Sequence, residues 1–127
     1  MPLSELAREI YAVLRTRVPA PKPELTYREL VEALPPLGAP FIGVHWRDPR
    51  LDQALADTVH ACRANGLPAL SAIVVNNETR RPGRRYYAEA HSGVAGDIER
   101  EVAWANELKH VRITTYPADL AGSGAES

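Results

Sequence analysis

The chain has 127 residues, of which 45% are hydrophobic and 24% are charged, and its formal net charge is −1. A chain of this size usually builds one hydrophobic core. No run approaches the roughly 20 apolar residues that a membrane-spanning helix needs, and no secretory leader is recognisable. Cys62 is the single cysteine, which excludes an intramolecular disulfide and a cysteine-type zinc cluster. We therefore expect a cytoplasmic protein without metal or cofactor, with one domain over 1–117 and a loose Gly- and Ser-containing tail over 118–127.

Two helices are predicted in the first part of the chain. Ser4 can cap a helix that must end before Pro19. Thr26 followed by Glu29 is a capping box, which predicts a second, short helix over about 27–34. The residues expected to face the core are Leu6, Ile10, Val13 and Leu14 in the first helix and Leu30, Val31 and Leu34 in the second.

The third predicted helix has clear signals at both ends. A stiff, proline-rich link over 19–24 and a brief apolar stretch over 41–44 precede it. Asp48 can cap the helix, Pro49 suits its first position, and Gly66 stands beyond its end. Its apolar residues repeat every three or four positions: Leu51, Leu55, Val59 and Cys62. We therefore expect Cys62 to be a core residue.

A basic β-hairpin is predicted next. The run 70–75 is short, apolar and partly β-branched, and is typical of a buried strand. A polar turn over 76–83 follows, and 84–90 is predicted to return as the second strand, with Tyr86 and Tyr87 on opposite faces. Within 71–86 there are four arginines and one glutamate, a local charge of +3. The arginines at or beside the predicted tip are Arg80, Arg81, Arg84 and Arg85.

The C-terminal part predicts a fourth helix and a last strand. Asp97 can cap the helix, and its apolar positions are expected to face the core: Ile98, Val102, Ala105 and Leu108. Alternating Val111, Ile113 and Thr115 predict the strand. The acidic face of the helix over 97–109 could engage a basic protein partner, as an immunity protein or antitoxin does, or cover the basic hairpin within a dimer.

Helices followed by a β-hairpin and a C-terminal helix and strand indicate an α+β, winged helix-turn-helix-like domain. In that architecture one helix enters the major groove of duplex DNA and the hairpin lies along the backbone. The third helix would read base edges, and the hairpin arginines would contact phosphates. Asp52 and Asp57 on the same helix oppose binding unless they face away. The base-contacting candidates are Gln53, His60 and Arg63.

Two segments resemble a known DNA-binding family. Residues 23–30 read Pro-Glu-Leu-Thr-Tyr-Arg-Glu-Leu, and 66–75 read Gly-Leu-Pro-Ala-Leu-Ser-Ala-Ile-Val-Val. Over about 8–87 the chain resembles the DNA-binding domain of O6-alkylguanine-DNA alkyltransferases and alkyltransferase-like proteins. The resemblance implies that Tyr27 contacts the DNA backbone. Arg28 stands where the family has a glycine, and it adds a candidate phosphate contact.

The same resemblance argues against the family's chemistry. Its reactive Pro-Cys-His-Arg segment, laid in register, falls on 70–73, which read Leu-Ser-Ala-Ile. Alkyl transfer needs a thiolate, and the unactivated hydroxyl of Ser71 has too high a pKa to replace one. Cys62 lies nine residues earlier on a predicted helix. Alkyltransferase activity is therefore not expected.

Three hypotheses for function remain open. The first is a non-enzymatic protein that binds duplex DNA in repair, regulation or phage defence. The second is a small nuclease toxin whose acid/base residues come from His45, His60, Glu89 and His91. For His45, a role as general base with Asp48 competes with the simpler reading that Asp48 caps the third helix. The third is an interaction module that works through the acidic helix. No His-Glu-x-x-His motif, phosphate-binding loop or Gly-x-Ser-x-Gly elbow is present in the sequence.

Overall fold

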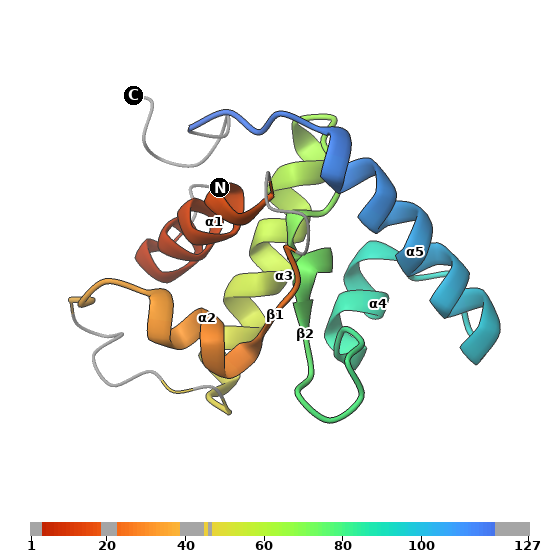
Figure 1. Cartoon of the computed structure of the whole chain (residues 1–127), viewed down its shortest axis with the longest axis horizontal. Coiled ribbons are helices and arrows are strands. Elements are labelled where there is room, and N and C mark those ends of the chain that lie inside the picture. Colours follow the sequence, from red (N-terminus) through yellow and green to blue (C-terminus); the bar gives the residue numbers. More distant parts are fainter. Residues whose placement is uncertain (1–3, 19–22, 39–44, 46, 119–127) are drawn as a thin grey trace.

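A computed structural model describes residues 4–18, 23–38, 45 and 47–118. Residues 19–22 of the predicted link over 19–24, the apolar stretch over 41–44 and the tail beyond 118 lie outside the described residues, as does Trp46. Figure 1 shows the elements in chain order, which are α1 (Glu5–Arg17), β1 (Leu25–Thr26), α2 (Tyr27–Ala33), α3 (Pro49–Ala64), the 3-10 helix η1 (Leu70–Ile73), β2 (Val74–Val75), α4 (Arg84–Ala90) and α5 (Asp97–Ile113).

Three predicted helix caps are confirmed by their contacts, whereas the predicted cap of α5 is wrong, because Asp97 is its first helical residue and Gly96 is the N-cap. Ser4 Oγ accepts a hydrogen bond from the backbone N–H of Ala7 at 3.1 Å. At α2 the capping box is complete, because Thr26 N–H donates to Glu29 Oε1 at 2.8 Å and Glu29 N–H donates to Thr26 Oγ1 at 3.1 Å. Asp48 caps α3 by accepting from Arg50 N–H at 2.9 Å, which supports the capping interpretation of this residue. Each contact satisfies an amide that has no partner within its own helix.

The core lies where α1, α3 and η1 meet. All four predicted apolar positions of α3 are buried, Cys62 among them, and so are Leu6, Ile10 and Leu14 of α1. The two strands form a parallel sheet in which Leu25 pairs with Val74 and Thr26 pairs with Val75. Since α2 begins directly after β1, this pairing sets the start of α2 beside the turn that follows β2 (Figure 1).

The predicted β-hairpin is wrong. Residues 70–73 form η1, the two residues of β2 pair in parallel with β1, and 84–90 form α4. A strand would have exposed one of the adjacent tyrosines, whereas a helix turns Tyr86 and Tyr87 toward the core together, each with an exposed fraction of 7%. The burial of both rings outweighs the β-propensity of the pair. The predicted class, α+β, is confirmed in a mostly helical form with a two-stranded sheet.

The C-terminal predictions also need correction. The strand expected over Val111, Ile113 and Thr115 is absent from the described residues, because α5 continues to Ile113. Of the four residues of α5 predicted to face the core, Leu108 packs against it and the other three do not. Ile98 and Val102 are 76% and 54% exposed, and Ala105 is exposed as well.

The side of α5 that packs on the core is set by three contacts with distant parts of the chain. Glu107 is buried and binds Arg63 of α3, Trp104 Nε1 donates to the carbonyl of Ala72 at 2.8 Å, and Val111 is fully buried. These contacts orient the helix, so its apolar stripe at 98, 102 and 105 faces outward.

Candidate nucleic-acid interface

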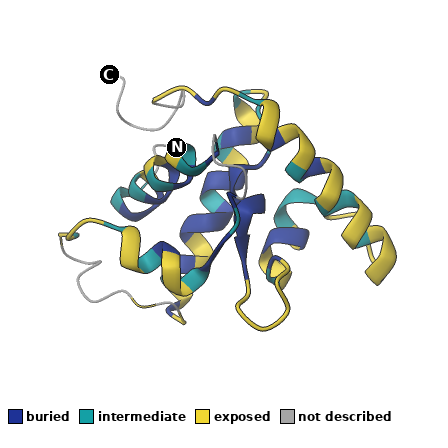
Figure 2. Cartoon of the chain, viewed as in Figure 1, coloured by how far each residue is buried: buried dark blue, intermediate teal, exposed yellow. Residues whose placement is uncertain are grey.

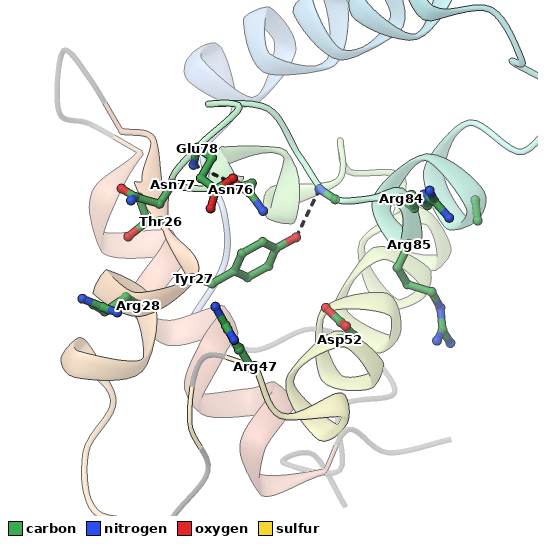
Figure 3. A pocket seen from close by; sticks show the side chains of 12 residues that line it. Thr26, Tyr27, Arg28, Arg47, Asp52, Asn76, Asn77, Glu78, Arg84 and Arg85 are labelled. Carbon is green, nitrogen blue, oxygen red and sulfur yellow. Dashed lines mark hydrogen bonds between the residues drawn. The ribbon is translucent and has the colours of Figure 1, made fainter.

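A cleft of about 760 Å³ opens where the starts of α2, α3 and α4 meet the turn after β2 (Figure 3). Its charged lining consists of four arginines and two acids, a local excess of +2. The arginines are Arg28, Arg47, Arg84 and Arg85, and the acids are Asp52 and Glu78. Asn76 and Asn77 add amide groups along the rim. Guanidinium and amide groups around an open cleft are suited to binding an anion.

Tyr27 lies at the centre of the cleft and joins two of its walls. Its hydroxyl oxygen accepts a hydrogen bond from Gly83 N–H at 3.1 Å, which ties the start of α2 to the start of α4 (Figure 3). Burial raises the pKa of Tyr27, so the phenol stays protonated at neutral pH. Among the described residues the hydroxyl hydrogen meets no acceptor. A ligand oxygen in the cleft can therefore receive it.

Gly83 has to be a glycine for this contact to exist. A Cβ at this position would lie 2.6 Å from the Tyr27 hydroxyl oxygen. That is closer than real Cβ contacts come, so either the tyrosine or the chain at 83 would have to shift. The requirement is one of space, because the backbone φ of Gly83 is −73°.

Two arginines on the first turn of α4 differ in their partners. Arg84 is exposed and makes no hydrogen bond or ion pair with any described residue. Arg85 is 44% exposed and bonds to Glu89 Oε2 and to Gln53 Oε1, both at 3.0 Å. Of these two arginines, Arg84 is therefore the one whose charge has no partner among the described residues.

The acidic side of the cleft opposes an anionic ligand. Burial raises the pKa of Asp52, and the nearby charge of Arg85 lowers it in part. Asp52 projects from the first turn of α3 into the cleft, near Arg85 (Figure 3). A bound phosphate would have to approach along the arginine side.

The other two predicted phosphate contacts lie in the turn outside the cleft lining. Asn76 organises the turn, because its N–H donates to the carbonyl of Arg81 and its carbonyl accepts from Arg80 N–H, both at 2.8 Å. Arg80 adopts a positive φ of 58°. Arg81 pairs with Glu101 of α5 at 3.1 Å and stays 52% exposed. Within the chain, Arg81 and Arg85 thus have acidic partners at the surface.

The predicted base-reading residues of α3 bind neighbouring helices and are not among the residues that line the cleft. Gln53 bonds to Arg85 and to Asp57, and His60 Nε2 lies 2.6 Å from Glu89 Oε1. Arg63 makes a bidentate pair with the buried Glu107 at 3.0 and 2.8 Å. The role of Arg63 in the fold is therefore to hold α5.

The four residues of the nuclease hypothesis do not meet in one site. His60 and Glu89 are paired, while His91 Nε2 lies 2.9 Å from the Tyr86 hydroxyl and 3.7 Å from Glu107 Oε1. His45 precedes α3, and His60 lies eleven residues beyond the first residue of that helix, which is about 16 Å along its axis.

Ser71, which the sequence resemblance aligns with the alkyltransferase cysteine, has closed surroundings. It is 4% exposed, and its Oγ has no hydrogen-bond partner among the described residues. The hydroxyl borders a cavity of about 20 Å³ behind Tyr27 and Arg85, room for a single water molecule. Cys62 is fully buried, and burial raises the pKa of its thiol to about 11. Neither side chain is presented as a nucleophile.

Sequence reasoning placed Tyr27, Arg28, Arg84 and Arg85 among the binding residues, and the structure brings these four to one cleft. It missed Arg47 and the two asparagines, Asn76 and Asn77, as lining residues. Their shared signal is positional, because each lies directly beside the start of a helix or the end of β2. The parallel pairing of β1 with β2 sets the asparagines beside the start of α2, and the packing of α3 on α4 brings Arg47 to the same cleft.

In the described ranges, no three His, Cys, Asp or Glu side chains are arranged to hold a metal ion. Nor does any helix there have both the length and the apolar composition to cross a bilayer. Comparison of the chain with models of protein families, with curated proteins and with solved structures gives no match.

Proposed function

We propose that the protein binds nucleic acid without catalysing a reaction on it, and that duplex DNA is its ligand. The observation that supports this proposal best is the convergence of four arginines and Tyr27 on one open cleft. The resemblance to alkyltransferase-type DNA-binding domains supports it independently, since it pointed to Tyr27 as a backbone contact. In this proposal the domain is of winged-helix type, with the turn over 76–83 and the start of α4 in the place of a hairpin wing.

Phosphate groups are the part of the ligand that the cleft suits. Arginine guanidinium groups bind phosphate oxygens with strong, charge-assisted hydrogen bonds. Arg84 and Arg85 approach from α4, while Arg28 and Arg47 approach from the starts of α2 and α3. Tyr27 lies between these two pairs and can donate its hydroxyl hydrogen to the same backbone (Figure 3).

Sequence preference is expected to be weak. The α3 side chains that could read base edges are bonded to α4 and α5, so base readout would have to break those contacts. Most of the affinity then comes from phosphate contacts, which carry no sequence information directly. Binding of this kind is salt-sensitive.

The proposal is tested by fluorescence anisotropy with a labelled 20-base-pair DNA duplex and with the matching single strand and RNA duplex. Arg84→Ala removes one phosphate contact and is expected to weaken duplex binding about three- to tenfold and to reduce its salt dependence. Arg8→Ala is the matched control, because Arg8 is exposed on α1, has the same charge and does not line the cleft. Equal affinities for the two variants would contradict the proposed interface. Tighter binding of the single strand or of the RNA duplex would show that duplex DNA is not the preferred ligand.

The nuclease alternative keeps one supporting contact, the 2.6 Å pair of His60 and Glu89. A His–carboxylate pair can serve acid/base chemistry, but the other two proposed residues lie elsewhere. Incubation of RNA and DNA with the protein in a chelator tests it, since intact substrate would reject the alternative and cleavage lost in His60→Ala would support it.

A further inference from the structure

The outward face of α5 carries exposed apolar side chains near both ends of the helix, with Lys109 on the same face between Ala105 and Ile113. Ile98, Val102 and Ile113 are 76%, 54% and 79% exposed, and Ala105 is exposed between them. Positions 98, 102 and 105 share one side of a helix, and 113 lies on the edge of the same side. Figure 2 shows α5 as a largely exposed helix at the border of the molecule, joined to the body by its opposite side. An exposed apolar stripe on a long helix indicates a surface that is covered by another molecule.

The charges of α5 are divided between its two halves. Its first turns carry Asp97, Glu99 and Glu101 with a single base, Arg100, and its last turns carry Lys109, His110 and Arg112 with a single acid, the buried Glu107. Such an order suits the helix dipole of a single chain. It also makes the helix complementary to itself when two copies run in opposite directions, because the acidic half of each copy then meets the basic half of the other.

The positions of these charges agree with one antiparallel register. Glu101 and Arg112 are eleven residues apart, as are Glu99 and His110. Eleven residues are close to three whole turns, so each pair lies on one flank of the stripe. A two-fold axis between Ala105 and Asn106 brings Glu101 and Arg112 of the second copy together on one flank, offset by about 3 Å along the helix, and it does the same for Glu99 and His110 of the second copy on the other flank. The same axis places Ile98 against Ile113 of the second copy.

The ion pairs within the chain leave room for this arrangement. Glu101 Oε1 binds Arg81, and Arg112 Nη2 binds Glu24, yet these side chains of α5 stay 51% and 47% exposed. Each therefore has accessible polar atoms for a second partner. The small side chain of Ala105 at the midpoint allows the two helices to approach closely.

We propose that α5 is a dimer interface, in which the outward stripes of two copies of this chain pack antiparallel. The acidic half of α5 disfavours a nucleic acid or an anionic membrane as the occupant, and the two-fold order of its charges favours a second copy. None of the residues that line the cleft lies on α5, so both clefts remain open in the dimer. The inference does not depend on the proposed function.

Sedimentation velocity from 1 to 300 μM protein tests the proposal. The expected result is a reversible monomer–dimer equilibrium whose dissociation constant rises at least about tenfold in Ile98→Asp and in Val102→Glu. Both residues are exposed within one chain, so the far-UV circular dichroism and thermal unfolding of the diluted variants should match those of the original protein. Ala12→Asp, which adds the same charge to an exposed position of α1, is the matched control and should dimerise normally. A chain that stays monomeric throughout, or a dimer that survives both substitutions, would overturn the proposal.

Two further variants test the register. Glu101→Arg and Arg112→Glu should each weaken the dimer, and the double variant should restore it, because the opposite pairs are then exchanged. Ala105→Cys should be joined to its second copy by a short bis-maleimide, whereas Ala12→Cys should not. The antiparallel register would be refuted if both cysteine variants, or neither, were cross-linked and the double charge variant failed to restore the dimer.

Discussion

Glu107→Gln tests the contact that fixes α5 on the fold. Glu107 is only 8% exposed, and it accepts hydrogen bonds from both terminal nitrogens of Arg63 and from Ala69 N–H at 2.7 Å. Glutamine has nearly the same shape, but it removes the charge and turns one acceptor into a donor that faces Arg63. The substitution therefore isolates the electrostatic part of the contact.

The expected cost follows from these contacts. Breaking a fully buried ion pair costs about 3–5 kcal/mol, but the Arg63 side chain is 41% exposed and solvent screens part of the interaction. We expect a loss of about 2–3 kcal/mol in the free energy of unfolding. For a chain of this length that corresponds to a fall of roughly 10 °C in the melting temperature.

The effect should depend on pH in one direction. Burial alone would raise the pKa of Glu107, but hydrogen bonds from Arg63 and Ala69 N–H outweigh it, so the pKa lies below its ordinary value of 4.5. A carboxylate with a lowered pKa in the folded state stabilises the fold above its unfolded pKa and loses that contribution as the pH falls through its folded pKa. The difference between the original protein and Glu107→Gln should thus be full at pH 7 and shrink below about pH 4.5.

Urea unfolding followed by far-UV circular dichroism at pH 7 and pH 3.5 measures both effects. Glu32→Gln removes the same charge from an exposed position of α2 and should change the unfolding free energy by less than about 0.5 kcal/mol. A Glu107→Gln cost below about 1 kcal/mol, or one that is equal at the two pH values, would refute the reasoning.

Three other substitutions or reactions give direct outcomes. Gly83→Ala should destabilise the fold by about 1–3 kcal/mol in denaturant titrations, since its Cβ would overlap the Tyr27 hydroxyl, and adding Tyr27→Phe should recover part of the loss; additive costs would contradict the clash. Cys62 should react with a thiol reagent at neutral pH only as fast as the protein unfolds, because the thiol is fully buried and its pKa is raised to about 11, and rapid labelling of folded protein would show otherwise. Asp52→Asn should tighten duplex binding in the anisotropy assay by removing a negative charge from the cleft; weaker binding by a folded variant would mean that Asp52 contacts the ligand.

The features that could be predicted from the sequence are local ones. The capping box of Thr26 and Glu29 and the cap at Asp48 need only residues within one turn, and both are present in the structure. Whether residues 84–90 form a strand or a helix could not be predicted from the local sequence. Tyr86 and Tyr87 favour a strand by propensity. The segment is a helix because in that form both rings pack against α3 and the residues around His91.

The orientation of α5 was beyond local reasoning for a similar reason. Ile98 and Val102 are more apolar than Glu107, so a hydrophobic pattern turns them inward. The ion pair that buries Glu107 involves Arg63, which lies 44 residues earlier in the chain. The site was predictable in part, because charge clustering identified Arg84 and Arg85, whereas Arg47 joins them only through the packing of α3 on α4.

The salt dependence of duplex DNA binding tests the central claim most directly. If two to four phosphates are contacted by the arginines of the cleft, the affinity of the original protein should fall about 10- to 150-fold between 50 and 200 mM salt. The fall should be smaller in Arg84→Ala and unchanged in Arg8→Ala. No binding at 50 mM salt, or an affinity that salt does not alter, would contradict the assignment of this cleft to nucleic acid.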